Sequence, residues 1–382
     1  MKFIASTTMG LESVVKKECV ELGFKNIKVD NGRVEFEGDF RTLAKANINI
    51  RCADRIFLKM GEFKALTYEE LFQEVKKIEW QNILPDDAEF PISWVSSVKC
   101  KLYSKSDIQK IVKKAIVEKL KIHYKKDFFE ENGAKYKIKV QGNKDIFAIM
   151  IDTSGDALNI RGYRKLHNSA PIKETMAAAL VKLSGWKKNI ALFDPMCGSG
   201  TILIEAAMMA KNIAPGSNRK FVSENWQVID KNIWIDERDE AYSKEIEEIN
   251  LNIFGSDIDE EAIKIAKKNS KNAGVEDCIN FDVKDVKDTK IDKETKDVYI
   301  ITNPPYGERL ISENEIEAFY SSLGKKFKKD FKVANYFIIT SYEDFEKVFG
   351  IKSNKNRKLY NGGIKCYFYQ YYGDKKWAKN NY

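Results

Sequence analysis

Asn303, Pro304 and Tyr306 come together in the stretch ITNPPYGERL, residues 301–310, directly after the apolar run DVYII. The Asn303 side-chain oxygen and the Pro304 carbonyl can accept hydrogen bonds from both N–H groups of one exocyclic amine, and the Tyr306 ring can stack on a nucleobase. Two successive prolines, each with φ fixed near about −65°, hold these acceptors in place before a substrate arrives. Asn-Pro pairs also mark rigid turns, so this stretch alone leaves a purely structural turn open.

A glycine-rich turn stands in the stretch LFDPMCGSGT. Asp194 closes an apolar strand, and Gly198 and Gly200 let the backbone pass close to a ligand. Thr201 then opens a helix whose N-terminal N–H groups can face a carboxylate. A strand-to-helix turn that needs glycines only for its backbone conformation would show the same sequence pattern. The pattern is GxG and not GxGxxG, so it differs from the fingerprint of nicotinamide-binding folds.

Acidic residues follow the next two strands. Asp257 ends the strand in FGSDID and can accept hydrogen bonds from both hydroxyls of a ribose. It lies 57 residues after the last glycine of the turn, against about 20 in dinucleotide folds, so a plain nicotinamide site fits poorly. Asp259 is the better candidate for the N-cap of the following helix. In INFDVKDV, Asp285 can accept from the exocyclic amine of an adenine, although Asp282 and Asp288 compete for that role.

An alternation of strands and helices that begins near Ala170 positions these stretches. Apolar strands such as NIALFD and INFDV alternate with amphipathic helices such as EEAIKIAKKNSKNAG, which is typical of a mostly parallel sheet with helices on both faces. Ligands of such sheets bind beyond the carboxyl ends of the strands, where the three stretches lie. The tail RKLYNGGIKCYFYQYY predicts an antiparallel hairpin that turns at Asn361-Gly362-Gly363. Residues 211–250 interrupt the alternation, and we expect this insertion to cover part of the site.

The first 165 residues read as two smaller modules. Residues 1–63 give the order strand, helix, two strands, helix, strand, with Asn31-Gly32 at a hairpin turn, which matches a ferredoxin-like unit. Residues 64–165 combine two helices, TYEELFQEVKKI and SKSDIQKIVKKAIVEKL, with three strands. This second module is too small and too basic for a catalytic domain, so we expect it to bind a partner.

Positive charge is concentrated in the second module. The chain carries a formal net charge of +8, whereas residues 99–144 alone hold 14 Lys and no Arg against five acids. Lys110, Lys113 and Lys114 fall on the side of the predicted helix away from its apolar residues. Such a run is either a solvated helix face or a surface for a polyanion, and nucleic acid is the commonest polyanion.

Composition argues against several classes of function. At 382 residues the chain is long enough for two or three domains. It has no run of about 20 apolar residues and no secretory signal pattern, so we expect a cytoplasmic protein without a membrane span. Six scattered cysteines and two histidines argue against a metal site, a disulfide framework and histidine-dependent catalysis. A 5-methylcytosine enzyme needs a cysteine nucleophile where this chain has Pro305-Tyr306.

The stretches DPMCGSGT, GSDID and NPPYGERL, taken together, resemble the class I S-adenosylmethionine-dependent methyltransferases that modify exocyclic amines. The upstream stretch LNIRGYRKLHNSAPIKETMAAALVKLSGW resembles more narrowly the THUMP-domain RNA guanine-N2 methyltransferases. The similarity extends over essentially the whole chain, including FIASTTMGLESVVKKEC near its start.

This resemblance implies an α/β fold preceded by α+β modules. Residues 1–63 would form a ferredoxin-like N-terminal domain and residues 64–165 a THUMP RNA-binding domain. Residues 166–382 would form a Rossmann-like class I methyltransferase domain with a mostly parallel seven-stranded sheet. Its strand order would be 3-2-1-4-5-7-6, and the terminal hairpin would supply the antiparallel seventh strand.

The resemblance also implies roles for residues. It makes S-adenosylmethionine the cofactor and places around it Asp194, Pro195, Cys197, Gly198, Ser199, Gly200, Asp257, Ile258 and Asp285. Asn303, Pro304 and Tyr306 would hold the target base without help from a metal, and Cys197 would be structural. Beside the three helix lysines, the candidate RNA contacts are Arg161, Arg164 and Arg309, for which a linker charge or an ordinary ion pair is equally open.

The implied activity is transfer of a methyl group to the exocyclic N2 amine of a guanine in structured RNA, first of all 23S ribosomal RNA. One alternative is a guanine of tRNA. Others are adenine N6 in DNA, a protein glutamine, or a non-catalytic RNA-binding assembly factor that retains the fold. The sequence leaves the oligomeric state open, with a monomer as the simplest case.

Overall fold

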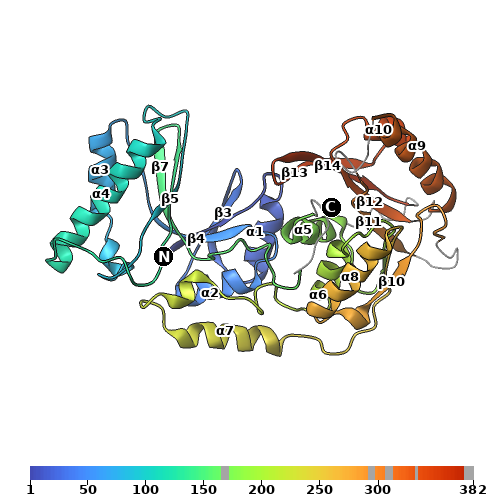
Figure 1. Cartoon of the computed structure of the whole chain (residues 1–382), viewed down its shortest axis with the longest axis horizontal. Helices are drawn as coiled ribbons and strands as arrows, with labels where there is room; N and C mark the ends of the chain where they lie inside the picture. The colour runs from blue at the N-terminus through green and yellow to red at the C-terminus, as the bar shows by residue number, and fades with distance from the viewer. Residues whose placement is uncertain (165–171, 291–296, 306–312, 332–333, 374–382) are drawn as a thin grey trace. The chain divides into compact units, whose positions relative to one another are not determined.

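The computed structural model of the chain (Figure 1) describes residues 1–164, 172–290, 297–305, 313–331 and 334–373. The chain divides into two units, and each has its own sheet. Unit 1 contains Met1–Thr7, Val15–Leu158 and Arg219–Ala241, and unit 2 contains Thr8–Val14, Asn159–Asn218 and Tyr242–Tyr382. No helix in the described part of the chain is both long and apolar enough to cross a membrane.

Unit 2 is built on a seven-stranded sheet. Its strands are β8 Ala191–Asp194, β9 Ile253–Asp257, β10 Ile279–Val283, β11 Val298–Thr302, β12 Asn335–Thr340, β13 Lys355–Asn361 and β14 Ile364–Tyr371. They lie in the order β10-β9-β8-β11-β12-β14-β13, which confirms the predicted order 3-2-1-4-5-7-6. β14 runs antiparallel to β12 and β13, and the other pairs are parallel. The carboxyl ends of β8 to β11 therefore meet at one edge.

Helices cover both faces of this sheet. They are α5 Glu174–Ser184, α6 Thr201–Ala210, α8 Glu260–Asn272, α9 Glu313–Asp330 and α10 Phe345–Phe349, with a short 3-10 helix, η3 Glu276–Cys278. Ile300 of β11 packs in one core cluster with Tyr320 of α9 and Phe345 of α10. Because strand residues alternate between faces, Ile301 points to the other side, where α5, α6 and α8 lie together (Figure 1).

Two helix ends in unit 2 follow their sequence signals. The Asp259 carboxylate accepts a hydrogen bond from the Glu261 N–H at 2.9 Å, which confirms it as the N-cap of α8. Gly185 ends α5 in the left-handed conformation, with φ 73°, as a C-terminal glycine commonly does. Asp257, at the end of β9, is therefore not the N-cap of α8, and its carboxylate can accept hydrogen bonds from other groups.

Unit 1 holds a second seven-stranded sheet. Its strands are β1 Lys2–Ser6, β2 Lys25–Asp30, β3 Arg33–Glu37, β4 Arg55–Lys64, β5 Ile92–Val98, β6 Ile138–Asn143 and β7 Ile146–Asp152. Helices that lie wholly or partly in unit 1 are α1 Glu12–Glu21, α2 Phe40–Asn49, α3 Tyr68–Lys77, α4 Lys105–Tyr124 and α7 Lys231–Ser243, with 3-10 helices η1 Trp80–Asn82 and η2 Val222–Asn225. The order β1, α1, β2, β3, α2, β4 is the ferredoxin-like order predicted from the sequence.

The two N-terminal modules share this one sheet, which the sequence did not predict. The strand order is β2-β3-β1-β4-β7-β6-β5. β4 is ten residues long and pairs antiparallel with β1 on one side and with β7 on the other. Without β7, the edge of β4 that faces away from β1 would expose a row of backbone N–H and C=O groups. The pairing with β7 satisfies these groups.

Part of the insertion at residues 211–250 belongs to unit 1. Its segment Arg219–Ala241 packs within unit 1. There Trp226 stacks on Tyr136 with ring centroids 4.7 Å apart and donates from Nε1 to the Lys135 carbonyl at 3.1 Å. No residue of the insertion lines the pocket described below. The buried aromatic rings of this segment give it a hydrophobic core to join, and a role for the insertion over the site stays a prediction.

Gly324 marks a close approach between α9 and α10. A Cβ at this position would lie 1.9 Å from the Phe349 carbonyl oxygen. Because backbone cannot yield as a flexible side chain can, we expect Gly324→Ala to lower the free energy of unfolding by about 3 kcal/mol, although alanine favours helices. Urea denaturation measures this, with the exposed Ser322→Ala as the control. A Gly324→Ala protein as stable as the wild type would contradict the packing.

Candidate active site

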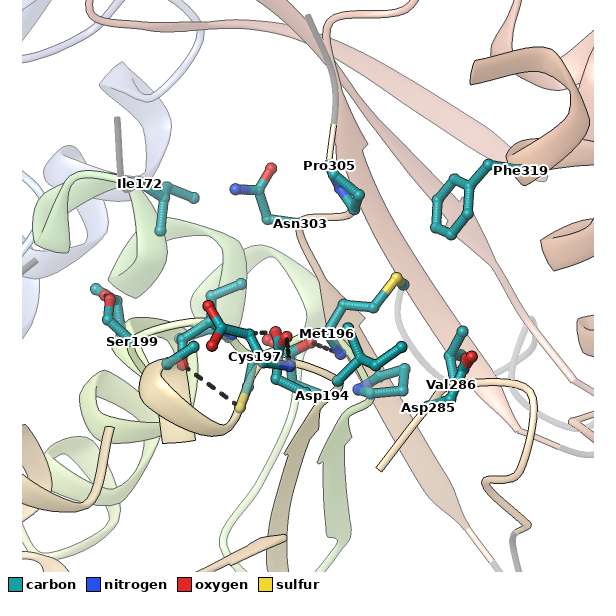
Figure 2. A pocket seen from close by; sticks show the side chains of 18 of the residues that line it. Ile172, Asp194, Met196, Cys197, Ser199, Asp285, Val286, Asn303, Pro305 and Phe319 are labelled. Carbon is teal, nitrogen blue, oxygen red and sulfur yellow. Dashed lines mark hydrogen bonds between the residues drawn. The ribbon is translucent and has the colours of Figure 1, made fainter. Parts of the chain in front are cut away.

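A pocket of about 680 Å³ lies in unit 2 at the carboxyl ends of four adjacent strands (Figure 2). Ligands of open parallel sheets bind at this edge. Its wall is formed by residues 194–199 after β8, 257–259 after β9, 285–287 after β10, and Asn303 and Pro305 after β11. Side chains from α6, α8 and α9 and Ile172 complete it. The three stretches singled out in the sequence therefore meet at one pocket.

Most of the predicted cofactor residues line this pocket. They are Asp194, Pro195, Cys197, Gly198, Ser199, Asp257, Ile258 and Asp285. Gly200 does not line it: with φ 79°, it begins α6, and a Cβ there would come within 3.0 Å of the Phe281 ring and 3.1 Å of Ala266. The positive φ and the close packing at this position account for the glycine. At Gly198 a Cβ would meet nothing within 4 Å.

Asp257 joins the end of β9 to the glycine turn. Its Oδ2 accepts a hydrogen bond from the Gly198 N–H at 2.8 Å, and its Oδ1 accepts from the Asp259 N–H at 3.1 Å. A carboxylate has about four acceptor positions, so both oxygens keep capacity for a ligand's hydroxyl groups. Asp257 therefore shapes the pocket as well as lining it, a role that its spacing in the sequence did not reveal.

Asp194 is a buried carboxyl group at the floor of the glycine turn. It is 2% exposed, and its Oδ1 accepts from the Met196 N–H at 3.1 Å. The pKa of Asp194 is raised to about 7, mainly by burial, and the charge of the neighbouring Asp257 acts in the same direction. At neutral pH this group is therefore poised between its protonated and charged forms.

Cys197 lies in the same turn and is not set up as a nucleophile. Its backbone N–H donates to the Ser256 carbonyl at 2.9 Å, which ties the turn to β9. Burial, and then the charges of Asp194 and Asp257, raise the pKa of the Cys197 thiol well above its usual value. A thiol kept protonated in this way fits the structural role expected from the sequence.

Among the three acids in or just after β10, Asp285 faces the pocket. Asp282 and Asp288 are exposed and do not line it. The Asp285 Oδ1 accepts from the Lys287 N–H at 2.9 Å, which fixes the carboxylate at the rim. Ile258, 70% exposed after β9, adds a bare apolar surface at the same pocket.

Asn303 places an oxygen without a partner at the pocket. Asn303 Oδ1 is buried and has no hydrogen-bond partner within the described part of the chain. A buried acceptor left unpaired costs free energy, so this oxygen is suited to a donor brought by a ligand. Pro304 is buried and does not line the pocket. Tyr306 lies outside the described residues.

Tyr320 and Phe319 are site residues that the sequence did not identify. The Tyr320 hydroxyl donates to the Pro305 carbonyl at 3.1 Å and shares a 2.8 Å hydrogen bond with Thr340 Oγ1, so it anchors the loop after β11. Phe319 lines the pocket from α9. Nothing in the local pattern of a helix distinguishes such residues, because only the packing of α9 against the sheet brings them to the site.

Arg161 and Arg164 form ion pairs inside unit 2, and contact with RNA stays a prediction for them. Arg161 Nε lies 3.3 Å from Glu205 Oε1, and both side chains are buried. Arg164 pairs with Glu174 at 3.0 Å and donates to the Ile172 carbonyl at 2.9 Å. Both arginines therefore form largely buried ion pairs within unit 2. Arg309, the third candidate, lies outside the described residues.

The three predicted lysines of α4 differ in their surroundings. Lys113 Nζ lies 2.6 Å from Glu131 Oε1 and 3.4 Å from the centroid of the Phe90 ring, so its charge is committed to the fold. Lys110 and Lys114 are exposed. The described residues contain no group of three or more His, Cys, Asp or Glu that could hold a metal ion.

A family model of the RMKL-like methyltransferase domain matches residues 161–370. The chain belongs to the RMKL-like methyltransferase family. A model of the RlmL ferredoxin-like domain matches residues 2–57, and a model of the THUMP domain matches residues 65–152. The resemblance read from the sequence is thus confirmed at the level of the family and of the fold class.

Relatives of this RMKL-like methyltransferase cover nearly all of it. "Putative RNA methyltransferase YpsC" of Bacillus subtilis (strain 168) is 46% identical over 97% of this chain and 95% of that protein. "Ribosomal RNA large subunit methyltransferase K/L" of Psychromonas ingrahamii is 35% identical over 97% of this chain, which spans 50% of that protein. The crystal structure of SMU.472 complexed with SAH superposes with a TM-score of 0.90 at 42% identity, covering 98% of each chain.

S-adenosylmethionine is the cofactor of this class I methyltransferase. The pocket fits such a ligand, since its volume lies within the range of about 300–1,000 Å³ that is usual for cofactor sites. Asp194, Asp257 and Asp285 line the pocket at or just after the ends of three neighbouring strands. Their carboxylates offer acceptors and negative charge to a ligand that carries hydroxyl groups, an amine and a positive sulfur.

The raised pKa of Asp194 predicts a pH dependence of stability. Because the fold disfavours the ionised form, the wild type should lose stability relative to Asp194→Asn as the pH rises toward about 7, with little further change above it. Between pH 5 and pH 8 the difference should grow by an amount on the order of 2–3 kcal/mol. Urea denaturation at each pH measures it, with the exposed Asp282→Asn as the control. A difference that stays constant with pH would contradict the assignment.

Proposed function

We propose that this methyltransferase transfers a methyl group to the exocyclic N2 amine of a guanine in structured RNA, first of all 23S ribosomal RNA. The observation that carries the proposal is the buried, unpaired Asn303 Oδ1 at a pocket suited to S-adenosylmethionine. The THUMP match over residues 65–152 and the names of the relatives support RNA as the substrate. Such a substrate would place the protein in the cytoplasm.

The chemistry of an exocyclic amine explains why an acceptor is needed. The lone pair of guanine N2 is delocalised into the ring, so the amine is a poor nucleophile. Hydrogen bonds accepted from its N–H groups favour a pyramidal nitrogen whose lone pair can point at the methyl group. Asn303 Oδ1 is one such acceptor, and the Pro304 carbonyl is the proposed second. Tyr320 holds the loop rigid through Pro305, so the acceptors are set before the base arrives.

We assign the cofactor contacts from the same geometry. Asp257 would accept from the ribose hydroxyls, and Asp285 from the adenine amine, with Ile258 against the adenine face. Asp194 and the turn at residues 195–199 would hold the methionine part. When bound, S-adenosylmethionine supplies a methyl group on a positively charged sulfur, so the chain needs no metal and no strong base. Tyr306 under the base and Arg309 near RNA phosphate stay predictions from the sequence.

Two other substrates use the same arrangement. A guanine of tRNA would present the same amine, and adenine N6 is also an exocyclic amine that Asn303 could accept from. The non-catalytic assembly factor is disfavoured, because it would leave the buried Asn303 oxygen without a use. Incubating the protein with labelled cofactor and total RNA that lacks the modification, followed by nucleoside analysis, distinguishes all of these. Label in N2-methylguanosine of 23S RNA is the expected result, and label only in another nucleoside would overturn the assignment.

Asn303→Ala should abolish most of the methyl transfer. It removes an acceptor that acts on the amine during reaction, so we expect kcat to fall about 100-fold or more, with the Kd of S-adenosylmethionine nearly unchanged. Single-turnover methylation and calorimetry measure the two quantities. The matched control is Asn280→Ala, an exposed asparagine on β10 that does not line this pocket. An Asn303→Ala enzyme with wild-type kcat would refute the catalytic role.

Asp257→Ala should weaken cofactor binding. It removes the proposed ribose acceptor and also frees the Gly198 N–H that Asp257 holds at 2.8 Å. We expect the Kd of S-adenosylmethionine to rise about tenfold or more, since hydrogen bonds to charged groups contribute about 1.5–3 kcal/mol. Isothermal titration calorimetry measures the change, and Asp282→Ala, one strand away and exposed, should bind normally. Equal affinities of the two variants would remove Asp257 from the cofactor site.

A further inference from the structure

Trp94 lies on the face of the unit 1 sheet that is opposite to α4. In the register of β5 and β6, Trp94 stands beside Lys139, whereas Val95 stands beside the buried Val140. Directly paired residues share a face, and successive residues alternate between faces. Ser97, on the same face as Val95, donates its hydroxyl to the Leu102 carbonyl in the segment that leads into α4. Trp94, Ser96 and Val98 therefore face away from this helix, whereas Ile92, before the register shift of β5, is buried and lies beside α4.

This open face carries large apolar side chains in contact with solvent. Trp94 is 46% exposed and Val98 is 54% exposed, and Ser96 lies between them on the same face. At about 3.3 Å per residue, the row from Trp94 to Val98 extends about 13 Å along β5. β5 is the last strand of the sheet, so no further strand flanks this row on its outer side.

Lys139 supplies a positive charge in the middle of this face. Its Nζ lies 4.1 Å from the centroid of the Trp94 ring and 4.9 Å from that of Phe57. No carboxylate of the described residues lies within ion-pairing distance of it. Burial and then the charge of Arg55 lower the pKa of Lys139, whereas the charges of Asp152 and Asp54 oppose this shift. An incoming anion would favour the charged form of Lys139 by attraction.

Exposed lysines continue the positive charge at the end of this row. Lys99 and Lys101 follow β5, and the Lys144 N–H donates to the Val98 carbonyl at 3.0 Å. None of the three forms an ion pair with a described residue. By contrast, four lysines of α4 and the segment after it are paired with acids: Lys113, Lys119, Lys121 and Lys126. Unneutralised charge of this module therefore lies at Trp94 and beyond it, in addition to the exposed Lys110 and Lys114 of α4.

We propose that Trp94, Val98, Lys139, Lys99 and Lys144 form a binding platform for an unpaired stretch of the RNA substrate. A base stacks on the exposed part of the Trp94 ring, and the lysines contact the adjoining phosphates. Stacking on an aromatic ring needs no particular base, so the platform grips RNA without reading its sequence. An apolar protein partner would bury these lysines without an acid to pair with them, so the charge favours a polyanion. The inference rests on RNA as the substrate and names the surface that holds it.

The test uses the full-length protein and a fluorescein-labelled, single-stranded RNA of 12 mixed nucleotides. Fluorescence anisotropy should show that Trp94→Ala weakens binding about tenfold or more, whereas Trp94→Phe, which keeps a ring, retains most of the affinity. Lys139→Gln should weaken binding and make it less sensitive to salt. The controls are Phe128→Ala, an aromatic residue 77% exposed outside this face, and Lys17→Gln on α1. Thermal unfolding confirms that each variant is folded.

Two outcomes would overturn the platform. One is equal RNA affinity of Trp94→Ala and the wild type, which would leave a protein ligand as the alternative for this face. The other is an equal loss in Phe128→Ala. Steady-state methylation separates this question from the proposed function, because Trp94→Ala should raise KM for RNA while kcat at saturating RNA is kept. If the wild type methylates no guanine N2 and Trp94→Ala still loses RNA affinity, the substrate assignment fails and the platform stands.

Discussion

The hydrogen bond from the Gly198 N–H to the Asp257 carboxylate is the interaction on which the site depends. It joins the turn after β8 to the end of β9, so that two strand ends form one wall of the pocket. The Cys197 N–H, bonded to the Ser256 carbonyl, fixes the same turn a second time. A glycine-rich turn is flexible by itself, and these bonds give it one conformation. Cofactor residues are thereby positioned before any ligand arrives.

The pocket contains buried polar groups, and a bound ligand can offset the free-energy cost of burying them. Asp194 is buried so deeply that its pKa rises to about 7, and the Asn303 oxygen is buried without a partner among the described residues. Each would be more stable with a donor or a positive charge beside it. A positively charged cofactor and an amine substrate supply these. Burying these two groups destabilises the protein without ligand, so binding of the cofactor and the amine is favoured.

Charge in unit 1 shows why composition is an incomplete guide to a binding surface. The lysine-rich stretch contains several lysines that acids neutralise at short distance, as Lys113 is by Glu131. Lys139 has no such partner in the described part of the chain and lies beside Trp94 and Phe57. A net charge counted along the sequence treats these lysines alike. In the fold, pairing decides which of them stays available to a polyanion.

The sequence by itself determined the ferredoxin-like order of β1 to β4 and the meeting of three motifs at one sheet edge, and its resemblance to a known family implied the strand order of unit 2. The first two features depend on periodicity, turn residues and caps such as Asp259, which neighbours in the chain encode. Only the tertiary structure decided that β4 pairs with β7, that Gly200 serves packing, and that Arg161 and Arg164 are buried in ion pairs. It also brought Tyr320 to the site. Burial and pairing join residues far apart in the chain, so no local pattern records them.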